Sequence, residues 1–153
     1  MRTSDGKLFT ESKALMSHSN YIRDHLEGGE IELTEISSAT LTLVITFLKH
    51  LQESHPCPFI EKPLRSSEMR DLTTEWYASF IDKDDYIVQE LILAADFLEI
   101  KELLMLGCAK MGCVIRGLTI QEFRQRFNIA NDFTPEEEAE AFDKVRLAAL
   151  AEE

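Results

Sequence analysis

Residues 86–98 have the sequence YIVQELILAADFL, which is apolar nearly all the way round a helix. At about 100° per residue, one face of that helix carries Ile87, Val88, Leu91, Ala94, Ala95 and Leu98. Tyr86, Leu93 and Phe97 fall on the opposite face, with Asp96 beside them. A surface helix needs one apolar stripe, so a second stripe predicts burial on both sides or a face kept for a partner. We expect these three side chains to be exposed in a lone monomer.

The next helix, predicted over residues 101–116 and ended by Gly117, has the same property. One of its faces carries Leu104, Cys108, Met111 and Ile115. Leu106 and Cys113 point elsewhere, so this helix also has apolar side chains on more than one side. We expect Cys108 and Cys113 to be small hydrophobic residues of the core.

Two capping boxes follow, Thr119–Glu122 and Thr134–Glu137, and the second has proline at the first helical position. The first opens a helix to about Phe127, and the second opens a helix over about 135–150. The apolar residues of the last helix are mostly small, and a helix of about 16 residues is marginal alone in water. We therefore expect it to be an arm that packs against a partner.

The amino-terminal half predicts shorter elements around one longer helix. They are a hairpin in residues 1–10 with its turn at Ser4–Gly6, two short helices in 11–27, a half-buried strand at 31–33, a helix from Ser37 or Ser38 to Gln52, and a short helix containing Trp76, Tyr77 and Phe80. The apolar face of the long helix is Leu41, Val44, Ile45, Leu48 and Leu51. Residues 53–73 contain three prolines and no clear period, which predicts an exposed, mobile loop.

Composition excludes several classes of protein. The net charge of −12 disfavours a basic face for nucleic acid or an anionic membrane. No apolar run approaches about 18 residues, and the first residues do not have the pattern of a signal peptide. The cysteine count is odd, at three, which favours a reducing compartment over a disulfide framework.

The sequence contains no familiar catalytic, nucleotide-binding or metal-binding motif. His50, His55 and Cys57 have a spacing that matches no known metal site, so we expect unpaired surface residues there and no bound metal. Cys57 and His55 lack a third group to orient them as a reactive pair. The acidic run Glu136–Glu138 is explained by the positive end of a helix dipole. We expect no catalytic residues, no cofactor and no enzymatic activity.

Two segments carry a resemblance to a known family. They are ELILAADFLEIKELL at residues 90–104 and FRQRFNIANDFTPEEEA at residues 123–139, and SDGKLF at residues 4–9 fits as well. In their order and spacing they resemble the Skp-type adaptor of SCF (Skp–cullin–F-box) ubiquitin ligases. The resemblance implies an α/β fold: a BTB/POZ-type domain over residues 1–116, with a small sheet and a helical cluster, and a helical extension over 117–153 that clasps an F-box.

The resemblance also implies site residues. Cullin binding or self-association falls on Tyr86, Leu93, Asp96 and Phe97. F-box binding falls on Leu104, Met111, Ile115, Phe123, Phe127, Ile129, Phe133, Phe142, Val145, Leu147 and Leu150, although ordinary core packing would explain each of them too. The family has an Asn-Tyr pair where this chain has Asp96-Phe97, and a tryptophan in the last helix that Leu147 or Leu150 would have to replace.

The resemblance implies an adaptor subunit that links a cullin to F-box substrate receptors, in the cytoplasm and nucleus. The expected partners are then F-box proteins and a cullin, and the chain forms a homodimer when they are absent. Neither nucleic acid nor a membrane is an expected partner. One alternative is a divergent paralogue that acts as a scaffold by self-association without a cullin. Another, an elongin-C-like adaptor, is disfavoured by the extension from Thr119 to Leu150.

Overall fold

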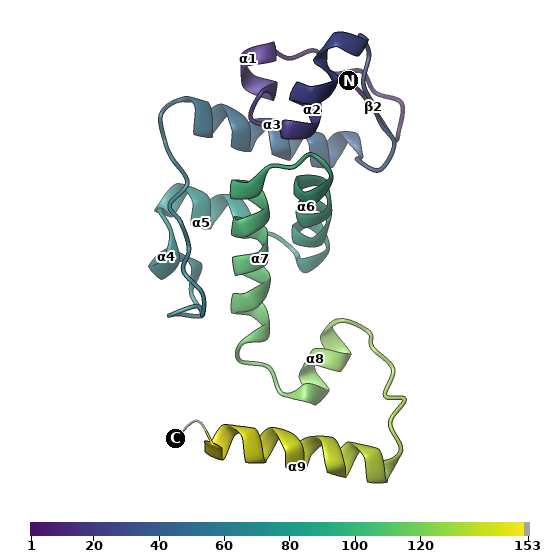
Figure 1. Ribbon diagram of the computed structural model, residues 1–153, viewed down its shortest axis with the longest axis vertical. Coiled ribbons are helices and arrows are strands. Elements are labelled where there is room, and N and C mark those ends of the chain that lie inside the picture. The colour runs from purple at the N-terminus through teal and green to yellow at the C-terminus, as the bar shows by residue number, and fades with distance from the viewer. Residues whose placement is uncertain (152–153) are drawn as a thin grey trace. The chain divides into compact units, whose positions relative to one another are not determined.

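The computed structural model describes the backbone of residues 1–151 and the side chains of residues 1–148 (Figure 1). The elements in chain order are β1 (Arg2–Thr3), α1 (Lys13–Met16), α2 (Asn20–His25), the 3₁₀ turn η1 (Leu26–Gly28), β2 (Glu32–Leu33), α3 (Ser38–Gln52), α4 (Met69–Leu72), α5 (Glu75–Ile81), α6 (Asp85–Phe97), α7 (Lys101–Ile115), α8 (Ile120–Arg126) and α9 (Pro135–Ala151). They form two compact units, Met1–Gly117 and Leu118–Glu153, which are described separately.

The first unit is mostly helical, with a small sheet at its amino-terminal end. Strands β1 and β2 are parallel, with Arg2 opposite Glu32 and Thr3 opposite Leu33. The expected hairpin is present as an antiparallel bridge between Arg2 and Leu8, and Gly6 in its turn has a φ of 78°, which glycine adopts without strain. Because each strand has two residues, the predicted α/β class describes only this small part of the fold.

Helices α3, α6 and α7 form the core of the first unit. Helix α6 packs along α7 and also contacts α3 (Figure 1). The buried residues of these helices include Leu41, Val44, Phe47 and Leu48 of α3, Val88, Leu91, Ala94 and Ala95 of α6, and Leu103 and Leu106 of α7. The predicted apolar faces of α3 and α6 are therefore confirmed, except that Leu51 and Ile87 are only half-buried. Phe47 extends the buried face of α3 because its ring packs against Tyr77 and Phe80 of α5.

A tight turn reverses the chain between α6 and α7. Glu99 has a φ of 54°, and the N–H groups of Glu99 and Ile100 donate to the carbonyls of Asp96 and Ala95. This pattern is the Schellman motif, which satisfies the last carbonyls of a helix. Ile100 is fully buried directly after the turn, so α6 and α7 are held as an antiparallel pair.

The segment 53–73 differs from its prediction as an exposed loop. Residues 53–68 lack helix and strand, but Ile60 is 3% exposed, and its N–H lies 3.4 Å from the Met105 sulfur of α7. Residues Met69 and Leu72 are buried in the short helix α4, which was not predicted. Single apolar residues without a period give no helical signal, although each of them anchors this segment to the core.

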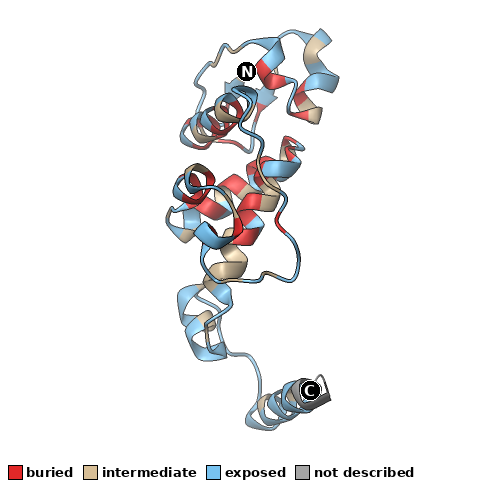
Figure 2. Cartoon of the chain, turned by 90° about the vertical axis from the view of Figure 1, so that its left-hand side faces the viewer, coloured by how far each residue is buried: buried red, intermediate tan, exposed pale blue. Residues whose placement is uncertain are grey.

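The second unit consists of α8 and α9, and both predicted capping boxes are present. The Thr119 hydroxyl accepts from the Glu122 N–H, while the Glu122 carboxylate accepts from the Thr119 N–H. Thr134 and Glu137 make the same reciprocal bonds at the start of α9. Buried residues are concentrated in the first unit, and none of the side chains described in 118–148 is buried (Figure 2). Within the described chain, no helix is both long and apolar enough to cross a membrane.

Candidate functional site

The outer face of α6 is an apolar stripe on the first unit. Tyr86 is 71% exposed and Leu93 is 66% exposed, although both are large apolar side chains. They are seven residues apart, which brings them to nearly the same angle round the helix. Asp96 is exposed at the edge of the stripe. We call Tyr86, Leu93, Asp96 and Phe97 the α6 surface; exposed apolar patches often mark binding sites.

The exposure of Phe97 was predicted incorrectly. Its side chain is half-buried, and its ring centroid lies 4.7 Å from that of Tyr21 in α2. The Tyr21 ring in turn stacks on His25 at 4.4 Å. The reason for the error is that the short helix α2 covers this end of α6, and helix periodicity alone does not reveal such a tertiary contact. The Phe97 side chain therefore packs against Tyr21 and is also partly exposed to solvent.

On α7, the predicted F-box face lies partly against the core. Leu104 and Met111 are partly buried and pack against core residues, whereas Ile115 is 40% exposed. Cys108 lies on the same face and is exposed, so its prediction as a core residue was wrong. Cys113 is half-buried, with its sulfur 3.6 Å from the sulfur of Met69. The all-round apolarity of the sequence did not distinguish the covered side of α7 from the open one.

Apolar side chains are also open on the second unit. Phe123 and Phe127 of α8 are half-buried and pack on each other with centroids 4.8 Å apart. The more open residues are Ile129 at 47%, Phe133 at 50%, Phe142 at 47%, Val145 at 64% and Leu147 at 66% exposure. Phe142 and Val145 share one face of α9, and Leu147 lies on another. Leu150, also predicted to bind an F-box, has a side chain outside the described residues.

A polar cluster joins α8 to α9 within the second unit. The Glu138 carboxylate accepts from the Arg124 guanidinium at 2.8 Å and from the Asn131 amide at 3.3 Å. The Arg124 guanidinium also lies over the Phe133 ring, 5.8 Å from its centroid. Hydrogen bonding to Arg124 holds the pKa of Glu138 below its ordinary value. The sequence reasoning missed this cluster, because residues 14 positions apart share no helical period.

Asn128 ends α8 in the conformation that most residues avoid. Its φ is 52°, and the N–H groups of Asn128 and Ile129 donate to the carbonyls of Gln125 and Arg124. This is again the Schellman motif, in which asparagine is a common alternative to glycine. The segment Phe127–Phe133 thus leaves α8 in a defined direction and presents Ile129 and Phe133 to solvent.

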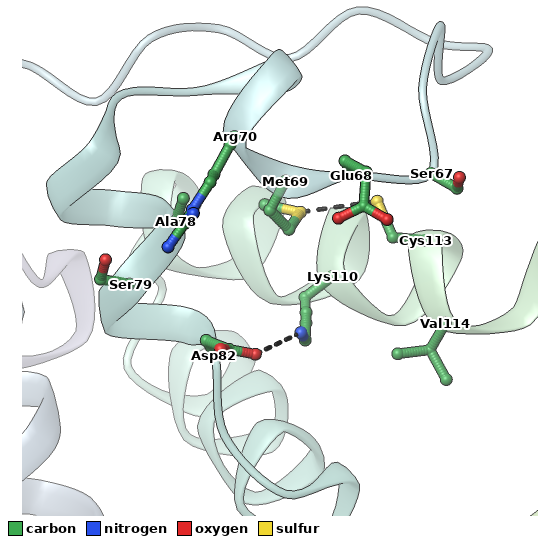
Figure 3. A pocket seen from close by; sticks show the side chains of 10 residues that line it. All are labelled: Ser67, Glu68, Met69, Arg70, Ala78, Ser79, Asp82, Lys110, Cys113 and Val114. Carbon is green, nitrogen blue, oxygen red and sulfur yellow. Dashed lines mark hydrogen bonds and ion pairs between the residues drawn. The ribbon is translucent and has the colours of Figure 1, made fainter.

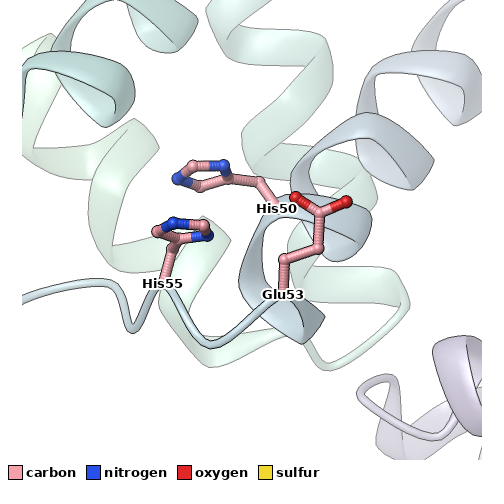
Figure 4. A group of neighbouring side chains, drawn as sticks. All are labelled: His50, Glu53 and His55. Atoms are coloured by element: carbon pink, nitrogen blue, oxygen red, sulfur yellow. The ribbon is translucent and has the colours of Figure 1, made fainter.

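The end of α3 gathers a second group of polar side chains, which we call the α3 histidine cluster: His50, Glu53 and His55 (Figure 4). The two imidazole rings stack with centroids 4.4 Å apart and planes 9° apart. The other side of the His50 ring stacks on Trp76 at 3.6 Å. The expectation of unpaired histidines here was wrong, because the chain turns back immediately after α3. Burial, with a smaller effect from His55, lowers the pKa of His50.

Cys57 does not belong to that cluster and has no arrangement for catalysis. Burial raises the pKa of its thiol to about 11, and Glu102 adds to the shift. A thiol with that pKa is almost entirely protonated near neutral pH, so it is a poor nucleophile.

A polar hollow of about 320 Å³ lies between α4, α5 and α7 (Figure 3). Lys110 of α7 reaches across it to the Asp82 carboxylate at 2.9 Å, and this hydrogen bond lowers the pKa of Asp82. Glu68 and Arg70 line the same hollow on the side of α4. The Lys110–Asp82 ion pair thus links α7 to the end of α5.

The chain is similar to a known protein family and to individual members of it. A protein-family model described as "Skp1 family, dimerisation domain" matches residues 101–144. The S-phase kinase-associated protein 1 homolog of Tetrahymena thermophila is 39% identical over 133 residues, which cover 86% of this chain and 80% of that protein. The E3 ubiquitin ligase complex SCF subunit sconC of Arthroderma otae is 34% identical over 143 residues, covering 90% and 86% of the two chains. SKP1-like protein 11 of Arabidopsis thaliana is 35% identical over 144 residues, covering 90% and 88%. The likeness extends along most of this chain and of each relative, and the chain is therefore a member of the Skp1 family.

Proposed function

We propose that this protein is the adaptor subunit of an SCF-type E3 ubiquitin ligase and links a cullin to F-box proteins. The observation that carries the proposal is family membership over most of the chain, including relatives named as SCF subunits. The structure supports it with large apolar side chains left open on both units. The scaffold alternative has no comparable support.

The α6 surface is the proposed cullin contact. Its exposed members Tyr86 and Leu93 lie on a helix whose other face is fixed in the core by Val88 and Leu91. Because the backbone of this helix is already fixed, binding does not have to order it, which favours affinity. Asp96 adds a negative charge at the edge, where charge affects partner choice more than total affinity. In this interpretation the first unit is a BTB/POZ-type domain.

The F-box contacts are proposed on the open face of α7 and on the second unit. Helix α9 is 17 residues long, and its described side chains are half-buried at most. A helix with so little packing of its own gains stability when Phe142 and Val145 are covered by a partner. Phe133, positioned by Arg124, is the proposed aromatic anchor, since buried aromatics contribute strongly to protein interfaces.

The proposed mechanism is binding without catalysis. The adaptor raises the effective concentration of a bound substrate near the ubiquitin-conjugating enzyme and contributes no reacting group. The protonated state of Cys57 agrees with this role. The three cysteines of the protein are free thiols, which supports the cytoplasm and nucleus as its proposed location.

Co-purification of the full chain with a cullin and with an F-box fragment tests the proposal. Leu93→Lys is expected to abolish capture of the cullin and to leave capture of the F-box fragment unchanged. Phe142→Lys is expected to have the reverse effect. These positions suit the test because both side chains are open, whereas a change at Phe97 would also disturb its contact with Tyr21. Failure of the unmodified chain to bind either protein would refute the proposal.

A further inference from the structure

We propose that the α3 histidine cluster binds a divalent transition-metal ion, with Zn²⁺ as the best fit. Each of the side chains of His50, Glu53 and His55 offers one ligand atom, and these atoms all lie within 4.8 Å of one another. Two imidazoles and a carboxylate are a donor set that zinc uses in proteins, with bonds of about 2.0–2.2 Å. The cluster lies outside the surfaces proposed for the cullin and the F-box, so this site is an additional one.

The backbone explains why these three side chains meet. His50 and Glu53 are three residues apart at the end of α3, which places them on the same side of the helix. Ser54 then adopts a left-handed φ of 67°, and the chain reverses directly after the helix. The reversal carries His55 back over His50, with the two rings nearly parallel (Figure 4).

Two contacts fix the His50 ring and the backbone of His55 without any metal. The His50 ring rests on Trp76, with planes 8° apart. The hydroxyl of Tyr77, a side chain that is 1% exposed, donates to the backbone carbonyl of His55. Supporting contacts of this kind reduce the conformational freedom that is lost on binding.

The cluster is open to an incoming ion. His55 and Glu53 are exposed, and His50 is half-buried against Trp76. In a tetrahedral zinc site the ligand atoms are about 3.3 Å apart, given the bond lengths above. Because Glu53 and His55 are exposed, the proposal has their side chains rotate on binding until the three ligand atoms reach that spacing, with water as the fourth ligand.

The chemistry of the ligands selects the class of ion. Imidazole suits Zn²⁺, Cu²⁺ and Ni²⁺, whereas Mg²⁺ and Ca²⁺ prefer oxygen ligands. A net charge of −12 attracts every cation to some extent, so selectivity separates a built site from general attraction.

The chain contains its own reporter for the test, because Trp76 is its single tryptophan. Paramagnetic Ni²⁺ bound to His50 would quench the fluorescence of the stacked indole. Titration of the full chain with Ni²⁺ is expected to give saturable quenching, which Zn²⁺ reverses by competition and excess Mg²⁺ does not. Unsaturable quenching, or equal displacement by Mg²⁺, would overturn the proposal.

Variants locate the site, with isothermal titration calorimetry of Zn²⁺ as a second measurement independent of the indole. His55→Ala is expected to weaken binding by at least about tenfold, since even groups that only support metal ligands contribute about 10- to 100-fold. Glu53→Gln is expected to weaken binding as well. Both side chains are exposed, so the core is retained. His18→Ala, which removes an exposed histidine in the turn after α1, is the matched control and should bind like the unmodified chain. Equal affinity of His55→Ala and the unmodified chain would contradict the assignment.

Discussion

Asp5 joins the amino-terminal turn to the start of α3 through its carboxylate. That carboxylate accepts from the Ser38 hydroxyl at 2.5 Å, from the Ser38 N–H at 2.9 Å and from the Thr3 hydroxyl at 2.6 Å. Hydrogen bonds from Ser38 first, and then from Thr3, hold the pKa of Asp5 well below its ordinary value. The residues of SDGKLF therefore have a structural role in addition to forming a turn.

Replacement of Asp5 by Asn is expected to lower the free energy of unfolding at pH 7, because the amide does not reproduce a charged acceptor of three hydrogen bonds. A carboxyl whose pKa is depressed by folding stabilises the protein above its unfolded pKa of about 3.9, and that contribution is lost as the pH falls through the folded pKa. Denaturant unfolding should show that the free energies of unfolding of Asp5→Asn and the unmodified chain become more similar below about pH 4. Asp24→Asn, which changes an exposed carboxylate, is the control. A loss of stability in Asp5→Asn that is the same at every pH would contradict this role of the Asp5 carboxylate.

The three thiols are expected to differ in reactivity. Cys108 is exposed on α7, whereas burial raises the pKa of Cys57 to about 11 and also raises the pKa of the half-buried Cys113. Because the thiolate is the reacting form, iodoacetamide near neutral pH should label Cys108 first and Cys57 slowly. Mass spectrometry of peptides over time measures the order. Labelling of Cys57 ahead of Cys108 would reopen the possibility of a thiol enzyme.

At the scale of elements, glycine permits the close approach of α6 and α7. Gly107 is buried, and a β-carbon there would lie 2.6 Å from Cγ1 of Ile92 on α6. At Gly112, also on α7, the nearest atom would be the terminal Cδ1 of Leu64 at 2.8 Å. Ile92 belongs to a packed helix, whereas Leu64 lies in the irregular segment before α4 and its terminal methyl can move aside.

Gly107→Ala is therefore expected to destabilise the chain by about 1–3 kcal/mol through overpacking. Gly112→Ala should leave stability unchanged or raise it, since alanine is about 1 kcal/mol more favourable than glycine inside a helix. Thermal unfolding measures the stability of both variants, which carry the same substitution at two positions of one helix. Equal stability of the two would show that α6 and α7 are less closely fixed than described.

The elements also show what the sequence could and could not predict. The buried faces of α3 and α6 and both capping boxes were predicted correctly, since these signals lie within a turn or a helical period. Helix α4 and the burial of Ile60 were not, because each depends on a contact with α7 that is distant in sequence. The contacts of Glu138 with Arg124 and Asn131 were not predicted either, because they join α8 and the segment after it to α9. The pairing of His55 with His50 was missed because the chain reverses at Ser54, directly after α3. The sequence does contain a signal for Glu53 as a member of the α3 histidine cluster, because its carboxylate follows His50 by about one helical turn.

At the scale of the whole molecule, the exposed α6 surface predicts self-association of the isolated protein. Light scattering after size exclusion should show a concentration-dependent dimer, because Tyr86 and Leu93 are open to solvent. Leu93→Lys is expected to give a monomer. Leu147→Lys, at a position with the same 66% exposure in the second unit, should still dimerise. A monomer at every concentration of the unmodified chain would contradict the prediction.

An adaptor must bind both partners at once, so the most direct test is the mass of a reconstituted complex. The full chain, a cullin and an F-box fragment are mixed, and light scattering after size exclusion gives the mass of the product. We predict one species that contains one copy of each, and its loss when the adaptor is omitted or carries Leu93→Lys. Two separate binary complexes, with the cullin and the F-box fragment excluding each other, would contradict the claim that this chain is a bridge.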